Sequence, residues 1–338
     1  MVAAQYLKFT HEHLAQAAQM LATQNEHILQ AFPLLPEKIC APTIAYEFLE
    51  ALLDRSESHG MVCEQGSQVQ AFMLGNYADN PFFGRHCWVP FGGMAFKQIE
   101  PYDELRRLYA AAGNEWMADE VINHYLVCPA FPAWLQAGYS LSFGQEQVYA
   151  VASLADLRPQ PALPGNLQMR EVQPADAAQL FERGHWIAAH LNSSPVWEPV
   201  PQQHLDNILP EYAKLATDPE CTTWVVVDDD DIVAYVVLYT VDCGPDYLLG
   251  VSSAAEFAAA AVHPDYRKRG IGRALFTHIL NIARQQHYST IFTDWRTTNL
   301  QAASYWPTFG FQPFAYRLLR RVNPRYQAYH QPPNKKAE

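Results

Sequence analysis

A basic, glycine-bearing stretch in the second half of the chain carries the clearest chemical signal, because residues 267–272 read Arg-Lys-Arg-Gly-Ile-Gly. The apolar run 257–262 before it predicts a buried strand, and the recurrence of Ile271, Leu275 and Ile279 after it predicts a helix. Free backbone N–H groups and the helix dipole make such a strand–loop–helix junction an anion site. Glycines let the backbone approach a phosphate closely. We therefore expect a phosphate-bearing ligand at this loop.

Two well-known phosphate loops fit the stretch poorly. The nucleoside-triphosphate loop ends in Gly-Lys-Ser/Thr, whereas an arginine and an alanine follow Gly272. The dinucleotide loop needs a third Gly or Ala where Leu275 stands, and residues 263–266 separate the strand from the glycines. Asp294 does lie at roughly the 20-residue distance of a ribose-binding carboxylate. A dinucleotide-binding oxidoreductase therefore stays open as the less favoured alternative.

Two blocks of the sequence resemble one enzyme family. Residues 262–272, Val-His-Pro-Asp-Tyr-Arg-Lys-Arg-Gly-Ile-Gly, resemble the Val-x-Pro and Arg/Gln-x-x-Gly-x-Gly/Ala signature of the GNAT superfamily of N-acetyltransferases. Residues 299–311 resemble the family's later block, which is Asn-x-x-Ala followed by an aromatic residue and Gly-Phe. The resemblance spans residues 167–322. It implies an α/β fold with a mixed twisted sheet flanked by helices, and acetyl-CoA as cosubstrate.

The resemblance also implies which residues hold acetyl-CoA. The strand ending at Val262 would pair with the pantetheine arm, so that the Val262 N–H faces the thioester carbonyl, and the loop would bind the pyrophosphate. Asn299 would contact the cofactor arm, and its place before a helix independently predicts an N-cap. The implied cofactor-binding residues are Val262, Arg267, Lys268, Arg269, Gly270, Ile271, Gly272, Arg273, Asn299 and Trp306.

Acyl transfer to an amine needs a base for the ammonium and an acid for the departing thiolate. Glu256 enters the strand where family members often carry a glutamate that acts through water; the alternative is a solvated carboxylate at a strand end. Asp294 and His263 are weaker candidates for the base.

The acid is where the sequence departs from the family. Counting back from the Gly-Phe pair at 310–311, the usual tyrosine position holds Trp306, and an indole is no acid near neutral pH. Tyr305 is adjacent, but consecutive helical side chains point about 100° apart, so we favour a packing role for it. Two alternatives stay open: water protonates the thiolate, or Tyr305 reaches the site as catalytic acid because Pro307 disturbs the helix.

The sequence indicates a duplicated domain. Its 338 residues allow about two domains, and residues 153–165 form a proline-rich linker. The halves begin alike, with 5–9 and 168–172 each followed by a helical pattern. They also end alike, because Trp134-Leu135 and Gly138-Tyr139 in the first half match Tyr305-Trp306 and Gly310-Phe311 in the second, each followed by a strand. We expect a degenerate GNAT-like domain at 1–152, a catalytic domain at 166–325 and a C-terminal tail at 326–338.

The first half lacks a phosphate site in the expected position. Its counterpart of the basic loop, Phe91-Gly92-Gly93, has no neighbouring positive charge. We therefore predict one coenzyme A per chain.

Bulk properties narrow the possible partners. The net charge of −12 argues against nucleic-acid binding, and no apolar stretch is long enough to span a bilayer. No Cys-x-x-Cys pair or spaced histidine array predicts a metal, and the six cysteines suit a reducing cytoplasm.

The four aspartates at 228–231 are typical of a solvated hairpin turn. We expect a monomer or homodimer.

The acceptor is predicted only as a class. Residues 184–201 occupy the segment that usually forms the acceptor wall, and a small-molecule amine suits its aromatic and acidic side chains, although helix packing explains them as well. The candidate residues there are His185, Trp186, Asn192, Trp197 and Glu198. The leading hypothesis is an acetyl-CoA-dependent N-acetyltransferase, and a non-catalytic coenzyme A sensor or scaffold is the alternative.

Overall fold

The computed structural model describes residues 3–155, 159 and 161–326, which form two compact units. The first unit holds residues up to Val148, Gly244–Leu249 and residues from Pro313 onward; the second holds Tyr149–Cys243 and Gly250–Gln312. The predicted tail lies outside the described residues except for Tyr326, as do 156–158 and 160 of the predicted linker.

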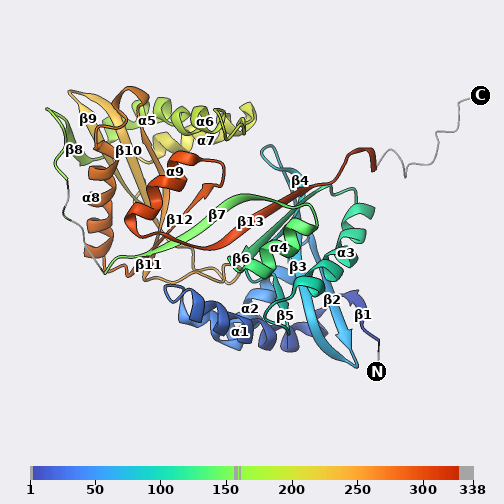
Figure 1. Ribbon diagram of the computed structural model, residues 1–338. Helices are drawn as coiled ribbons and strands as arrows, with labels where there is room; N and C mark the ends of the chain where they lie inside the picture. Colours follow the sequence, from blue (N-terminus) through green and yellow to red (C-terminus); the bar gives the residue numbers. More distant parts are fainter. Residues whose placement is uncertain (1–2, 156–158, 160, 327–338) are drawn as a thin grey trace, which may run out of the picture. The chain divides into compact units, whose positions relative to one another are not determined.

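The first unit is a mixed sheet with helices on its faces (Figure 1). Its strands run in the order β1-β2-β3-β4-β6-β13, with β5 on β3; β4 and β6 are parallel, and the pairs β1–β2, β2–β3, β3–β4, β3–β5 and β6–β13 are antiparallel. The elements are β1 (Gln5–Lys8), η1 (His11–His13), α1 (Leu14–Ala31), η2 (Glu37–Cys40), α2 (Pro42–Leu53), β2 (Ser58–Gln65), β3 (Gln68–Asn80), β4 (Gly84–Val89), β5 (Met94–Phe96), α3 (Tyr102–Ala118), β6 (Asn123–Pro129), α4 (Pro132–Ser140) and β13 (Gln312–Arg321).

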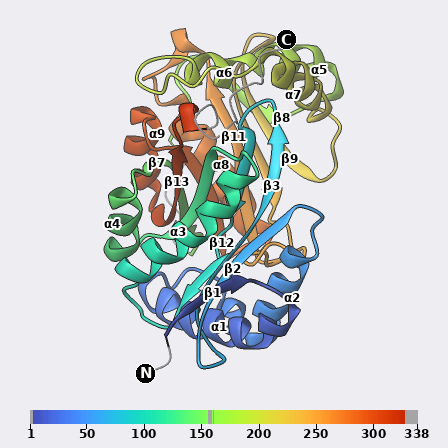
Figure 2. The ribbon, with the colours of Figure 1, turned by 90° about the vertical axis from the view of Figure 1, so that its right-hand side faces the viewer.

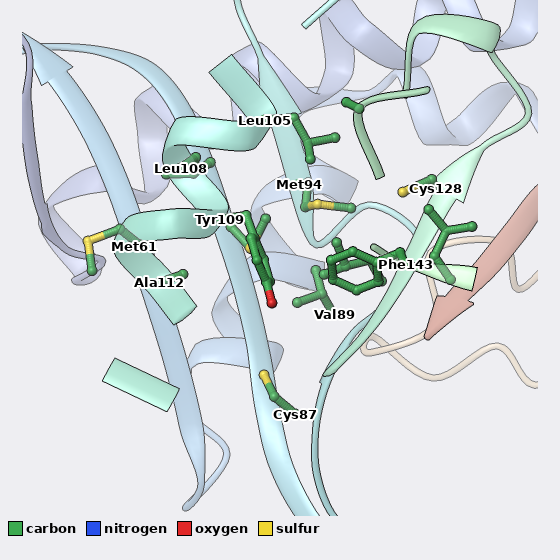
Figure 3. Close-up of a cluster of buried hydrophobic side chains, with 14 of the residues drawn as sticks. Met61, Cys87, Val89, Met94, Leu105, Leu108, Tyr109, Ala112, Cys128 and Phe143 are labelled. Atoms are coloured by element: carbon green, nitrogen blue, oxygen red, sulfur yellow. The ribbon is translucent and has the colours of Figure 1, made fainter. Parts of the chain in front are cut away.

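One large core of this unit lies between the sheet and the helices α3 and α4. Met61 of β2 and Met94 of β5 contribute side chains to the same cluster as Leu105 and Leu108 of α3 (Figure 3). These apolar positions on α3 recur at helical spacing, and Trp134 of α4 is 1 % exposed in the same cluster. Burial of this apolar face fixes both helices on the sheet.

The second unit repeats this plan. Its strands run in the order β12-β11-β10-β9-β8, with β11 and β12 parallel and the rest antiparallel. The elements are β8 (Gln168–Glu171), η3 (Pro174–Asp176), α5 (Ala177–Arg183), α6 (His185–Leu191), α7 (Gln202–Lys214), β9 (Cys221–Asp228), β10 (Asp231–Thr240), β11 (Ala254–Val262), η4 (Pro264–Tyr266), α8 (Ile271–Gln285), β12 (Thr290–Arg296), α9 (Leu300–Tyr305) and η5 (Trp306–Phe309); β7 (Gly144–Ser153) runs from the first unit into the second.

Helices cover both faces of the second sheet. Val225 and Val227 of β9 pack in one cluster with Leu180 of α5. Trp224, whose side chain points to the opposite face because strand residues alternate, meets His278 of α8 edge-on with ring centroids 4.0 Å apart. Figure 2 shows the same arrangement, with α5, α6 and α7 grouped together and α8 apart from them.

The two units share one order of elements, with the exception of their last strands. β13 follows the second unit in sequence, yet it pairs antiparallel with β6 of the first unit from Ala315↔Pro129 to Arg321↔Asn123. The mixed α/β architecture with flanking helices is the predicted one. The partner of the last strand follows from tertiary pairing, which no local pattern specifies.

Several local expectations are confirmed and one is wrong. The helix after the glycine loop is α8, and residues 229–230 form the turn between β9 and β10. The run 257–262 is a strand, but it is not buried throughout, because Ala258 and Ala260 are exposed. In the part of the chain that the structure describes, no helix is long and apolar enough to cross a membrane.

Candidate functional site

The two parallel strands β11 and β12 separate partway along their length. They pair only at Ala254↔Thr290, Ala255↔Ile291 and Glu256↔Phe292, although β11 continues to Val262 and β12 to Arg296. At the same place, the register between β10 and β11 skips Ala258, which marks a β-bulge. The separation exposes the edge of β11 beyond Glu256, where Ala258 and Ala260 are exposed.

The backbone of Val262 faces this open edge. The His263 N–H donates to the Val233 carbonyl at 2.9 Å, so His263 bonds toward β10. Consecutive residues of an antiparallel ladder alternate between bonding toward and away from the neighbouring strand. The Val262 N–H therefore points away from β10, toward the side where β12 has separated. An extended ligand could pair there as an added strand.

The glycine loop closes the end of this edge. Gly270 is the residue before α8 and has φ +85°, a left-handed conformation that favours glycine. The helix begins with the bond from the Ala274 N–H to the Gly270 carbonyl, at 3.0 Å, so the N–H groups of residues 271–273 are left for other partners. A Cβ built on Gly270 would meet nothing within 4 Å, which leaves room for an anion at the helix N-terminus.

The predicted basic side chains surround this loop in different ways. Lys268, Arg269 and Arg273 are exposed, whereas the Nε of Arg267 donates to the Val262 carbonyl at 3.1 Å. Arg267 thus ties the loop to the end of β11. Ile271 is buried and anchors α8 on the sheet.

A second contact orients Arg269. Its guanidinium lies over the Tyr266 ring, 5.0 Å from the centroid, and the Tyr266 hydroxyl donates to Asp228 at 2.5 Å. The hairpin of aspartates therefore supports the loop through Tyr266.

Tyr305 and Trp306 point to different places. A Cβ built on Gly272 would lie 3.6 Å from the Tyr305 hydroxyl and 3.5 Å from Val262 Cγ2, so the phenol reaches the junction of loop and strand edge. Trp306 is 8 % exposed and packs against Phe257 and Phe276, with ring centroids 4.9 Å apart in each case.

The local backbone explains this arrangement. Tyr305 is the last residue of α9, and a 3₁₀ turn begins at Trp306 because Pro307 disfavours continuation of the α-helix. The ring of Tyr305 also packs against Phe309 at 5.0 Å, so one residue combines packing with a hydroxyl directed at Gly272.

Burial and neighbouring charges shift the pKa of both catalytic candidates, Glu256 and Tyr305. Desolvation raises the pKa of Glu256, and the negative charges of Asp294 and then Asp242 raise it further. Desolvation also raises the pKa of the Tyr305 phenol, against a smaller lowering effect of Arg273. Glu256 lies at the point where β11 and β12 separate, and Asp294 is exposed on β12.

His263 follows the last residue of β11 and contacts α6. Its ring meets Trp186 edge-on at 5.3 Å, and its Nδ1 accepts from the Asp265 N–H at 3.3 Å. These contacts fix the turn that leads into the loop.

Asn299 has two partners. Its Oδ1 accepts from the Ala302 N–H at 3.1 Å, which confirms the predicted N-cap, and it also lies 3.1 Å from His190 Nε2 of α6. Because Oδ1 is the acceptor of the cap, His190 Nε2 must carry the hydrogen. Sequence reasoning missed His190, since no local pattern marks a histidine whose partner lies 109 residues away.

A partly buried ion pair lies beside this cap. Arg296 Nε at the end of β12 contacts Glu198 Oε2 at 2.7 Å, and Arg296 is only 8 % exposed. Glu198 belongs to the predicted acceptor wall, but Arg296 was not foreseen, because a buried arginine at the end of an apolar strand looks like a solvated one in the sequence.

The corresponding region of the first unit is closed. β4 and β6 remain paired from His86↔Asn123 to Val89↔Leu126, so β4 has no open edge up to its last residue. A Cβ on Gly92 would lie 2.6 Å from Leu248 Cδ2, so this turn is filled by packing. A cavity of about 470 Å³ occurs elsewhere in this unit, along α1, where the amides of Gln16 and Gln24 bond strand backbones.

Known proteins resemble this chain in a family signature and in fold. Residues 186–311 match the model of the Acetyltransferase (GNAT) family. A search of curated proteins finds no significant match.

Solved structures give likeness over almost the whole chain. A GCN5-related N-acetyltransferase from Sphaerobacter thermophilus superposes with a TM-score of 0.63 at 13 % identity, covering 95 % of this chain and 96 % of that one. A tandem GNAT protein from the clavulanic acid biosynthesis pathway gives 0.54 at 12 % identity, covering 95 % and 99 %. At such identities the likeness concerns the fold.

Proposed function

Since the chain belongs to the GNAT superfamily through the domain in its second half, we propose that it is an acetyl-CoA-dependent N-acyltransferase acting on a small-molecule amine. One observation carries the proposal: the unpaired edge of β11 leads directly to the glycine loop at the N-terminus of α8. A strand edge that continues into an anion site suits a ligand with an extended amide-bearing arm and a pyrophosphate.

The residues present fit coenzyme A. The open space at Gly270, the N–H groups at the start of α8 and the exposed Lys268, Arg269 and Arg273 would hold the pyrophosphate. The β11 edge would pair with the arm. Bound acetyl-CoA would supply the acyl group, activated as a thioester.

Three groups of the chain then divide the chemistry. The Val262 N–H donates a hydrogen bond to the carbonyl oxygen on which negative charge develops. Glu256 accepts a proton from the acceptor ammonium through water, and its raised pKa makes it a better base than an ordinary glutamate. Tyr305 donates a proton to the departing sulfur, because its raised pKa keeps the phenol protonated through the neutral range.

Titration calorimetry with acetyl-CoA, NAD and ATP tests the binding assignment. We expect only acetyl-CoA to bind, with one molecule per chain, because β4 stays paired along its edge in the first unit. A stoichiometry of two, or preferential binding of NAD, would contradict the assignment. Release of free coenzyme A thiol in the presence of a panel of primary amines then separates an enzyme from a non-catalytic coenzyme A-binding protein.

The pH dependence of turnover tests the base. Activity should fall as the pH drops through the pKa of Glu256, because the protonated carboxyl accepts no proton. Asp294→Asn removes a negative charge that raises this pKa, so the acidic limb of the profile should move to lower pH. Asp242→Asn, the weaker neighbour, should move it less. Glu256→Gln should reduce turnover by roughly a hundredfold or more, and an acidic limb that stays in place in both aspartate variants would refute this assignment.

A further inference from the structure

The cavity of about 470 Å³ in the first unit lies where α1 faces the strands β3 and β5 and the start of α4. Two glutamines of α1 hold this helix against the strands. The Gln16 side chain accepts a hydrogen bond from the Val69 N–H at 3.0 Å. The Gln24 amide accepts from the Phe96 N–H and donates to the Met94 carbonyl, at 3.1 Å in each case. Because these bonds fix α1 at two points roughly 12 Å apart along its axis, the cavity along this face is part of the folded frame.

Much of the cavity lining is apolar. Phe96 and Trp134 line it, and their rings meet edge-on with centroids 5.1 Å apart. Phe131 also lines it and packs against Phe32, with ring centroids 5.6 Å apart. Ile99 belongs to the same lining and is 56 % exposed, so its apolar surface is only partly covered by the protein. A flat apolar group suits such a surface.

The charge of the lining is positive. Among the described residues, the lining includes Lys97 and contains no aspartate or glutamate, although the chain as a whole has a net charge of −12. Lys97 is exposed, and no carboxylate pairs with it in the described part of the chain. The side chains of Gln19 and His27, which line the same cavity, also have no protein partner there. The ammonium of Lys97 is therefore available to an anionic ligand.

We propose that this cavity is a binding site for an organic anion, whose carboxylate pairs with Lys97 and whose apolar ring packs against the aromatic lining. The cavity volume lies within the usual range for ligand sites, about 300–1,000 Å³. Gln19 offers an amide donor to the carboxylate. A cation is disfavoured, because the described lining holds no carboxylate to pair with it. The inference does not rest on the proposed function, because the cavity belongs to the first unit and the β11 edge belongs to the second.

Titration calorimetry with two naphthalene compounds of nearly equal size tests the site. Naphthalene-2-carboxylate should bind with one molecule per chain. Naphthalene-2-carboxamide keeps the ring and removes the charge, so it should bind about tenfold more weakly, the scale of a hydrogen bond to a charged group.

The charge assignment is tested at Lys97. Lys97→Gln keeps a polar side chain and removes the positive charge, so the carboxylate should bind about tenfold more weakly while the affinity for the carboxamide stays the same. Lys8→Gln is the matched control, because Lys8 is an exposed lysine of β1 that does not line the cavity. It should leave both affinities unchanged.

The location is tested by filling the cavity. Thr23→Trp places a large ring at an exposed lining position of α1 and should abolish binding of the carboxylate. Gln30→Trp, at an exposed position of the same helix outside the lining, should leave the binding intact. Gly272→Asp should also leave it intact, because Gly272 belongs to the second unit.

Each result decides for or against the site. No binding of naphthalene-2-carboxylate, equal binding of the carboxamide, or unchanged affinity in Lys97→Gln or Thr23→Trp would overturn the inference. Loss of the carboxylate in Gly272→Asp would place the anion at the proposed coenzyme A site and overturn it as well. If Thr23→Trp melts at a markedly lower temperature, Ala15→Trp, at another exposed lining position of α1, decides in its place. Failure of acetyl-CoA to bind would contradict the proposed function alone.

Discussion

Gly272→Asp should abolish acetyl-CoA binding while leaving the fold intact. The residue lies in the first turn of α8, where a carboxylate would occupy the place of an anionic ligand and repel it. Like charges brought together at a binding site cost several kcal/mol, so the affinity should fall by at least about a hundredfold. Stability should hold, because a negative charge in the first helical turn interacts favourably with the helix dipole.

Gly272→Ala is the matched control for this substitution. Its Cβ would make ordinary contacts, 3.5 Å from Val262 Cγ2 and 3.6 Å from the Tyr305 hydroxyl, and it adds no charge. Calorimetry should therefore show a much smaller loss of affinity than with Asp, and both variants should melt close to the wild type. Unchanged acetyl-CoA affinity in Gly272→Asp would remove the basis for the pyrophosphate site.

Tyr305→Phe should reduce turnover by roughly a hundredfold or more, the usual scale for general acid catalysis. The substitution removes only the hydroxyl that lies beside Gly272 and keeps the ring that packs against Phe276 and Phe309. Acetyl-CoA affinity and melting temperature should therefore change little. Steady-state turnover of an amine found in the panel, together with a thermal melt, measures both quantities.

Trp306→Phe gives the opposite pattern and serves as the control. The indole fills the aromatic core around Phe257, Phe276 and Phe311, so a smaller ring leaves a cavity and lowers the melting temperature. Turnover per folded molecule should stay within a few-fold of the wild type. A Tyr305→Phe variant as active as the wild type would show that Tyr305 only packs, the role that helical spacing alone favours.

The sequence by itself predicted the features that depend on local chemistry. A loop with Gly270 and Gly272 before an amphipathic helix dictates a helix N-terminus open to an anion, because φ +85° at Gly270 suits glycine and the first N–H groups of a helix have no internal partner. Asn299 was predicted as an N-cap for the same local reason. The mixed sheet with flanking helices was predicted from the resemblance of residues 262–272 and 299–311 to the two signature blocks of the family.

Only the tertiary structure decided the features that depend on partners distant in sequence. Three such features are the separation of β11 from β12, the pairing of β13 with β6, and the bonds of His190 and Glu198. Each depends on segments far apart in the sequence, and no periodic pattern of residues predicts which of these segments lie side by side. The orientation of Tyr305 required knowledge of what α9 packs against, because helical spacing fixes the angle of about 100° between Tyr305 and Trp306 but not the direction in which either side chain points. The local sequence determines which backbone and side-chain groups a segment leaves free to interact. Long-range packing determines which of these groups come into contact.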